Sequence, residues 1–146
     1  MLKSRVAVAF TVALALMPRL ALAQGDTTIT IKALSNTLEF VPASIAVKAG
    51  TRLHLRFVNE GTYPHNFVLP KKDDDIDDLA AAAMNAGESG FVPVAMKDKL
   101  IAYTGLISPG QVGELDIIVP APGKYTYVCL FPGHSANMLG TLRSLK

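Results

Sequence analysis

The sequence contains too few cysteines for an internal crosslink, and few of its residues are charged. Its 146 residues include one cysteine and no tryptophan, and 18% of them are charged against 50% that are hydrophobic. A single cysteine cannot form an intramolecular disulfide, so the fold has to depend on a hydrophobic core. The high apolar content and low charge exclude an intrinsically disordered chain, and the length suits one ordinary domain.

The first 23 residues have the three parts of a secretory signal peptide. Lys3 and Arg5 give a positive start, an apolar run follows, and Ala21-Leu22-Ala23 is an A-x-A cleavage site. The apolar run is shorter than the roughly 18 residues of a membrane-spanning helix, which disfavours an uncleaved anchor. We expect cleavage after residue 23, no stable membrane insertion afterwards, and a mature domain of residues 24–146 that is periplasmic or otherwise exported.

The formal net charge of +2 belongs mainly to that first segment. Lys3, Arg5 and Arg19 lie in it, and their removal leaves 11 basic against 12 acidic residues, a net charge of −1. A protein that binds nucleic acid nonspecifically needs an excess of positive charge. We therefore expect no nucleic-acid partner.

The remaining sequence contains eight short runs typical of β-strands, separated by turns rich in proline and glycine. In residues 52–59, Leu53, Leu55 and Phe57 alternate with polar residues, which include His54. This alternation predicts a half-buried strand and places His54 on the polar face, away from any ligand role. Many short strands predict an all-β sandwich or barrel. The other seven runs are residues 28–33, 44–48, 66–69, 100–104, 114–119, 124–130 and 141–145.

Residues 73–87 break the β pattern. Their apolar side chains recur at helical spacing, which predicts one short helix with the acidic residues 73–75 at its N-terminus and Gly87 at its end. A calcium loop is the alternative interpretation of the acidic run, but the turn glycine and distal glutamate are missing at the needed offsets. The apolar residues are Ile76, Leu79, Ala80, Ala83 and Met84.

Chemistry-bearing residues gather near the C-terminus. Cys129, His134 and Met138 lie within ten residues, and His65 lies far upstream in a Pro-His-Asn sequence. Two histidines and a cysteine with a weak axial methionine form the ligand set of a blue-copper electron-transfer site. Thiolate and thioether are soft ligands that suit Cu(I), whereas imidazole suits both oxidation states.

Each of these residues has an ordinary structural role when taken singly. A cysteine or methionine is often a core residue, and a histidine is often solvated. The combined spacing, and an unpaired thiol in an exported protein, favour metal binding over these ordinary roles. A Cys–His nucleophile would not need Met138. Zinc remains an alternative occupant of the same ligands.

With these motifs, the chain resembles the cupredoxins, the azurin/plastocyanin family of type 1 blue copper proteins, and above all the azurin/auracyanin branch. The matching segments are residues 129–142, 65–69 and 100–107. The resemblance implies an eight-stranded Greek-key β-sandwich with one short helical insertion. It also implies one copper ion held by His65 Nδ1, Cys129 Sγ and His134 Nδ1, with Met138 Sδ as the weak axial ligand.

The same resemblance implies a soluble one-electron carrier rather than an enzyme. Cys129 is flanked by Val128 and Leu130, whereas in cupredoxin enzymes histidines beside the cysteine lead to a second copper. We expect a monomer that docks transiently with redox proteins such as cytochromes or membrane redox complexes. A copper storage or delivery protein without redox turnover is the alternative function.

Two further expectations concern the surroundings of the site. Asn66 is expected to tie the two ligand segments together by side-chain hydrogen bonds, and the N–H groups of Asn66 and Phe131 are expected to point at the Cys129 sulfur. An apolar collar is expected around His134, formed by Leu130, Phe131, Pro132, Met138 and Leu139.

Overall fold

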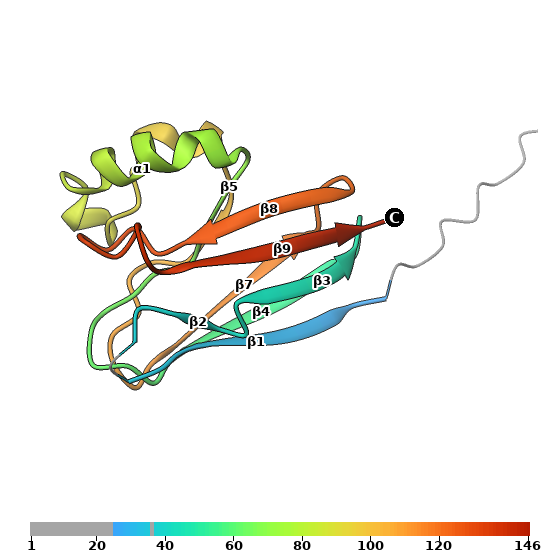
Figure 1. The fold of residues 1–146 in the computed structure, drawn as a ribbon, viewed down its shortest axis with the longest axis horizontal. Coiled ribbons are helices and arrows are strands. Elements are labelled where there is room, and N and C mark those ends of the chain that lie inside the picture. The colour runs from blue at the N-terminus through green and yellow to red at the C-terminus, as the bar shows by residue number, and fades with distance from the viewer. Residues whose placement is uncertain (1–24, 36) are drawn as a thin grey trace, which may run out of the picture.

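In the computed structural model, which describes residues 25–35 and 37–146, two β-sheets face each other and a helical segment covers one end (Figure 1). The expected signal peptide lies outside the described residues. Among those that are described, no helix is both long and apolar enough to cross a membrane. The first sheet has the order β2-β1-β4-β7 and the second β3-β9-β8-β5-β6.

The strands agree with the alternation of the sequence. Each of the eight expected runs overlaps a strand, so the all-β expectation with two sheets and one short helix is confirmed. The described residues hold one further strand, the two-residue β2, which is too short to show a period. The bounds are β1 Thr27–Ala33, β2 Phe40–Val41, β3 Ser44–Lys48, β4 Arg52–Asn59, β5 Val68–Pro70, β6 Leu100–Tyr103, β7 Val112–Ile118, β8 Gly123–Val128 and β9 Leu139–Leu145.

Parallel pairing joins strands that are distant in the sequence. β1 lies parallel to β4, and β3 lies parallel to β9, while the other pairs are antiparallel. The inward faces of both sheets form a buried core whose centre is aromatic. Phe40 contacts the rings of Phe57, Phe67 and Tyr127 at centroid distances of 5.6, 6.2 and 5.1 Å, all near T-shaped. Edge-to-face packing of this kind adds to the stabilisation that burial provides.

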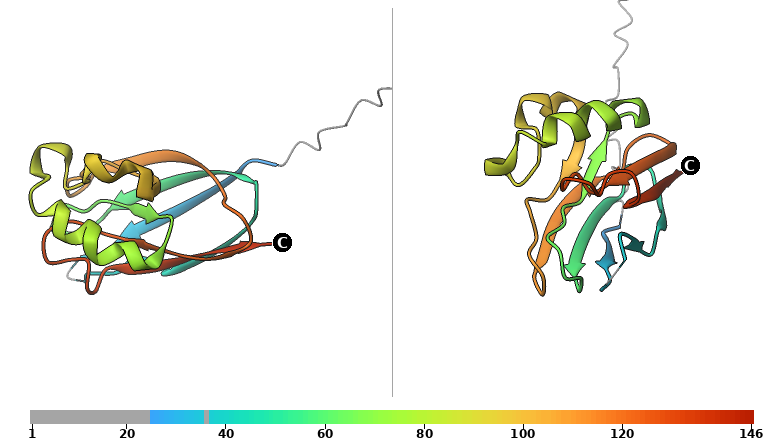
Figure 2. Two further views of the ribbon diagram at one scale, coloured as in Figure 1. Left: turned by 90° about the horizontal axis from the view of Figure 1, so that it is seen from above. Right: turned by 60° about the vertical axis from the view of Figure 1, so that its left-hand side comes forward.

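The helical insertion lies between β5 and β6 and covers the outer face of the second sheet near one end (Figure 2). It consists of α1, Ile76–Ala83, and the 3₁₀ segments Asp73–Asp75, Gly87–Ser89 and Val94–Lys99. Leu79 and Ala83 of α1 pack with Val92 against Val68 and Val128 in a second apolar cluster.

The expected helix is shorter than its sequence pattern, and its acidic start does not cap it. The Asp73 carboxylate accepts hydrogen bonds from the Thr126 N–H at 3.0 Å and the Thr126 hydroxyl at 2.8 Å. Asp75 pairs with Lys99 at 2.8 Å. Asp73 therefore fastens the insertion to β8, and Asp75 joins the two ends of the insertion. The helix ends at Ala83, four residues before Gly87.

Candidate metal site

Backbone hydrogen bonds hold His65 in place. His65 forms an isolated β-bridge with Ile107, in which its N–H donates to the Ile107 carbonyl at 3.1 Å. The Ile107 N–H donates back to the His65 carbonyl at 2.7 Å. This bridge places the imidazole at the edge of the sandwich core, a short distance before β5 reaches its pairing with β8.

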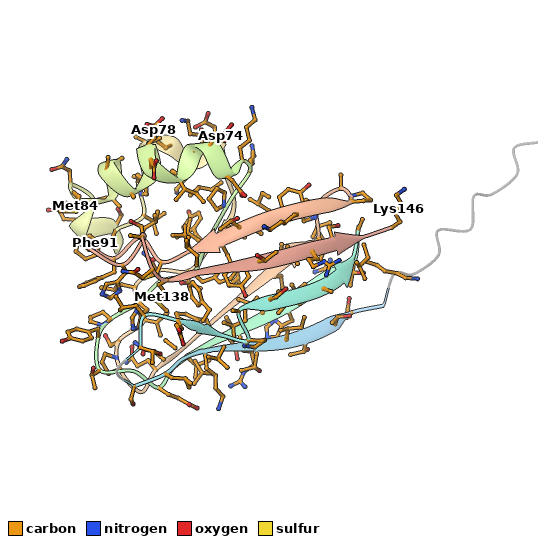
Figure 3. The ribbon with its side chains drawn as sticks, in the orientation of Figure 1. Asp74, Asp78, Met84, Phe91, Met138 and Lys146 are labelled. Carbon is orange, nitrogen blue, oxygen red and sulfur yellow. The ribbon has the colours of Figure 1, made fainter. Side chains whose placement is uncertain are left out.

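The segment from Cys129 to Met138 folds back on itself. The Met138 N–H donates to the His134 carbonyl at 2.8 Å, and the Cys129 N–H donates to the Met138 carbonyl at 3.1 Å. Gly133 has a φ of 82°, a left-handed conformation that glycine adopts without a steric cost. The loop thereby returns Met138 to the start of the segment, at the end of the sandwich opposite Lys146 (Figure 3).

Three donor atoms converge at this end. Cys129 Sγ lies 3.8 Å from His65 Nδ1 and 3.7 Å from His134 Nδ1, and the two nitrogens are 3.2 Å apart. A metal ion with bonds of about 2.3 Å to sulfur and about 2.0 Å to nitrogen, at trigonal angles, spaces these pairs by about 3.7 Å and about 3.5 Å. The observed triangle therefore fits a three-coordinate metal ion. Met138 is fully buried in the same core cluster as Cys129.

Burial controls the protonation of these donors. It lowers the pKa of His65 to about 4, with a smaller contribution from the charge of His134, and it also lowers the pKa of His134. Both imidazoles are therefore neutral at pH 7 and keep a lone pair for a metal. Burial raises the pKa of the Cys129 thiol to about 11, against the opposing effect of two backbone N–H groups. A bound cation would favour the thiolate that burial disfavours.

Comparisons with known proteins point to a copper-binding family. The sequence profile of the copper binding proteins, plastocyanin/azurin family, matches residues 27–144. The chain belongs to this family. It is 36% identical to auracyanin-B of Chloroflexus aurantiacus over 119 residues, which cover 79% of this chain and 51% of that protein. It is 34% identical to azurin iso-2 of Methylomonas over 131 residues, which cover 83% of this chain and 98% of that protein.

The fold agrees with that of solved cupredoxins. The structure of auracyanin A, a blue copper protein from Chloroflexus aurantiacus, superimposes with a TM-score of 0.79 at 31% sequence identity, covering 83% of this chain and 100% of that one. The chain spans about half the length of auracyanin-B. The expected family and its metal, copper, are confirmed, and the members of this cupredoxin family are electron carriers.

Asn66 links the ligand segments of this cupredoxin as expected. Its side-chain Oδ1 accepts a hydrogen bond from the Leu130 N–H at 2.7 Å, and the N–H groups of Asn66 and Phe131 bond to Cys129 Sγ. The sequence did not indicate the other end of the amide, where Asn66 Nδ2 donates to the Gly90 carbonyl at 2.9 Å. Gly90 belongs to the helical insertion, and no local sequence motif predicts this hydrogen bond.

The surface over His134 differs from the expected apolar collar. Leu130 and Met138 are buried and do not contribute to it, whereas Leu139 is 38% exposed. Tyr63 is 59% exposed, with its ring edge-on to His134 at a centroid distance of 6.3 Å. Its position two residues before His65 is the sequence feature that could have predicted Tyr63 near the site. A hollow of about 440 Å³ opens beside these rings, lined by Leu34, Thr37, Leu38, Thr62, Tyr63, His65 and His134.

His54, expected to have no ligand role, lies apart from the three donors. Its Nδ1 is 2.9 Å from an Asp116 carboxylate oxygen on the outer face of the first sheet. The chain therefore offers a histidine outside the site, whose removal should not disturb the three donors.

Proposed function

We propose that this cupredoxin is a soluble one-electron carrier that holds one type 1 copper ion. His65 Nδ1, Cys129 Sγ and His134 Nδ1 are the proposed equatorial ligands, and Met138 Sδ is the proposed weak axial ligand. The observation that carries the proposal is the buried cluster of His65, Cys129 and His134, whose donor atoms lie within 4.8 Å of one another. A thiolate, two imidazoles and a thioether are the donors of blue-copper electron-transfer sites.

The chain's part in the proposed function is to keep the donors in place. Copper, when bound, supplies a reversible one-electron step. The His65 bridge and the hydrogen bonds of the 129–138 loop hold the donor backbone on both sides of the site. Side chains that are locked by packing and hydrogen bonds rearrange little when the charge of the site changes. His65 and Cys129 are 1% and 0% exposed, so these two side chains lie almost entirely out of bulk water.

His134 is the proposed point of electron exit and entry, because its ring packs edge-on against the exposed Tyr63. Leu139, which is also exposed, follows His134 by five residues and is proposed as part of the same surface. This small apolar surface suits brief docking with cytochromes or membrane redox complexes, since redox encounters use small interfaces. The monomeric state is part of the same proposal, as is a location outside the cytoplasm. The three-part pattern of residues 1–23 supports export and a mature domain of residues 24–146.

Titration of the purified protein with Cu(II) tests the copper site. We expect one equivalent to produce an intense blue thiolate-to-copper absorption with narrow copper hyperfine splitting. Cys129→Ser should abolish the band, and His54→Ala should leave it unchanged, because His54 lies on the outer face of the first sheet. Absence of the band in the unmodified protein, or its survival in Cys129→Ser, would reject the proposal.

Electron exchange separates a carrier from the alternative of a storage or delivery protein. A carrier should be reduced and reoxidised rapidly and repeatedly without losing copper. Stopped-flow reduction by a small cytochrome gives the exchange rate, and transfer of copper to a chelator gives the release rate. Fast release combined with slow reduction would favour storage or delivery.

A further inference from the structure

The helical insertion meets the candidate site through two adjacent residues, Gly90 and Phe91. The Gly90 carbonyl accepts a hydrogen bond from Asn66 Nδ2 at 2.9 Å. The Phe91 ring packs against Phe131 at a centroid distance of 5.1 Å and an interplanar angle of 75°. Asn66 and Phe131 are the residues whose N–H groups bond to Cys129 Sγ. Both contacts of this turn therefore end on residues that surround the sulfur.

The turn has an unusual backbone. Gly90 and Phe91 have φ angles of 68° and 60°, both in the left-handed region. A Cβ atom on residue 90 would lie 2.8 Å from the Leu106 backbone nitrogen, so this position requires glycine. A bulky residue at positive φ is a genuine outlier, and such strain persists where the surrounding structure enforces it. Here the Phe91 N–H donates to the Ala86 carbonyl at 2.9 Å, which helps to hold the turn.

The Gly90 carbonyl decides which way the buried Asn66 amide faces. A carbonyl oxygen can only accept, so it selects the NH₂ end of the amide and turns Oδ1 toward the Leu130 N–H, 2.7 Å away. Without the Gly90 carbonyl the amide loses this constraint. The Leu130 N–H, buried beside Cys129, then risks losing its acceptor.

The Phe91 ring acts on the other side of the sulfur. Phe131, against which it packs, also contacts the His134 ring at a centroid distance of 4.8 Å. A series of three rings therefore runs from the insertion to a candidate ligand. Removal of the first ring leaves Phe131 without its support on the insertion side.

We propose that the Gly90–Phe91 turn is a positioning element for the Cys129 sulfur, which holds the Asn66 and Phe131 N–H groups in hydrogen bonds to it. The consequence for the reduction potential rests on the proposed function, whereas the hydrogen-bond geometry does not. Hydrogen bonds around the cysteine sulfur tune the potential of blue-copper sites. They withdraw electron density from the thiolate and favour the reduced ion, so weaker bonds lower the potential.

Amide hydrogen exchange in the metal-free protein tests the geometry. Phe91→Gly relieves the backbone strain but removes the ring, and Phe91→Leu keeps an apolar side chain without the ring. In both variants we expect exchange at Asn66, Leu130 and Phe131 to become about tenfold faster. Phe91→Tyr should retain the original rates. Ile76→Ala, which also removes apolar surface from the insertion, is the matched control and should accelerate these three amides less than either Phe91 variant.

The copper-loaded variants provide the second readout. Phe91→Leu and Phe91→Gly should lower the reduction potential and shift the thiolate-to-copper band, while Phe91→Tyr and Ile76→Ala should not. Unchanged amide exchange in Phe91→Leu would overturn the positioning role, even if Phe91→Gly does not fold. Equal acceleration in Ile76→Ala would overturn it too, because the effect would then be general loosening of the insertion. Failure of the unmodified protein to bind copper would reject the proposed function, but the exchange result would still decide this inference.

Discussion

The described residues form two apolar clusters that meet at β8. The sandwich cluster lies between the sheets and contains Cys129 and Met138 together with the aromatic centre. The insertion cluster lies under α1 and contains Val128 and Leu130. Successive residues of an extended segment point to opposite faces, so neighbours of Cys129 in the sequence belong to the other cluster. The cysteine segment is therefore held from both sides.

The two clusters have different roles at the candidate site. The sandwich cluster decides where the candidate ligands lie, because β5 and β8 belong to its sheets. The insertion cluster contributes no candidate ligand, but its neighbouring turn bonds to Asn66 and packs on Phe131. Loss of the first cluster should destroy the site, whereas loss of the second should loosen the site in a folded protein.

Phe40→Ala should have the largest effect on stability. Phe40 is 1% exposed and contacts three aromatic rings of the sandwich cluster. Truncation of a buried phenylalanine costs about 3–5 kcal/mol in the free energy of unfolding. Urea unfolding measures this loss, and Val41→Ala at the neighbouring exposed residue is the control. A similar loss in both variants would contradict the central place of the aromatic cluster.

Leu79→Ala should have a smaller and more local effect. Leu79 is fully buried in the insertion cluster, but that cluster is smaller and is bordered by half-buried residues. We expect a loss of about 2–3 kcal/mol, at the lower end for leucine truncations. Hydrogen exchange should accelerate in residues 76–92 before it does so in β8 and β9. Uniform acceleration throughout the chain would show that the two clusters unfold as one unit.

Leu139→Asp should leave stability almost unchanged and affect docking alone. A charge at this 38% exposed position should slow electron exchange with a cytochrome several-fold, while the blue absorption stays the same. Met84→Asp, on the 61% exposed side chain at the end of α1, is the matched control and should not change the rate. Equal slowing in both variants would place the docking surface on the insertion as well.

The strands could be predicted because a half-buried strand repeats every two residues, as in residues 52–59. β2 could not, since two residues carry no period. The expected helix cap failed for another reason. Asp73 is a good capping residue locally, but Thr126, 53 positions away, offers its carboxylate both an N–H and a hydroxyl donor. Such a contact exists only once the chain is folded.

The candidate ligands could be predicted because core packing alone seldom requires a thiol, an imidazole and a thioether at such short spacing. The structure brings His65, Cys129 and His134 together as the sequence suggested. The sequence did not indicate Gly90 or Phe91. Phe91 has a positive φ, which most phenylalanines avoid, so the residue type does not predict this conformation.

The parallel pairing of β3 with β9 has a consequence for the way the chain folds. Ser44 lies opposite Thr141, so this edge of the sheet closes only after a long stretch of chain has been brought together. Long-range strand pairing slows folding. Until β9 settles between β3 and β8, the Cys129 thiol lacks the enclosure that makes it 0% exposed in the folded protein. Oxidation and intermolecular disulfide formation are therefore hazards of the folding interval, and rapid capture of a metal ion would shorten the exposure.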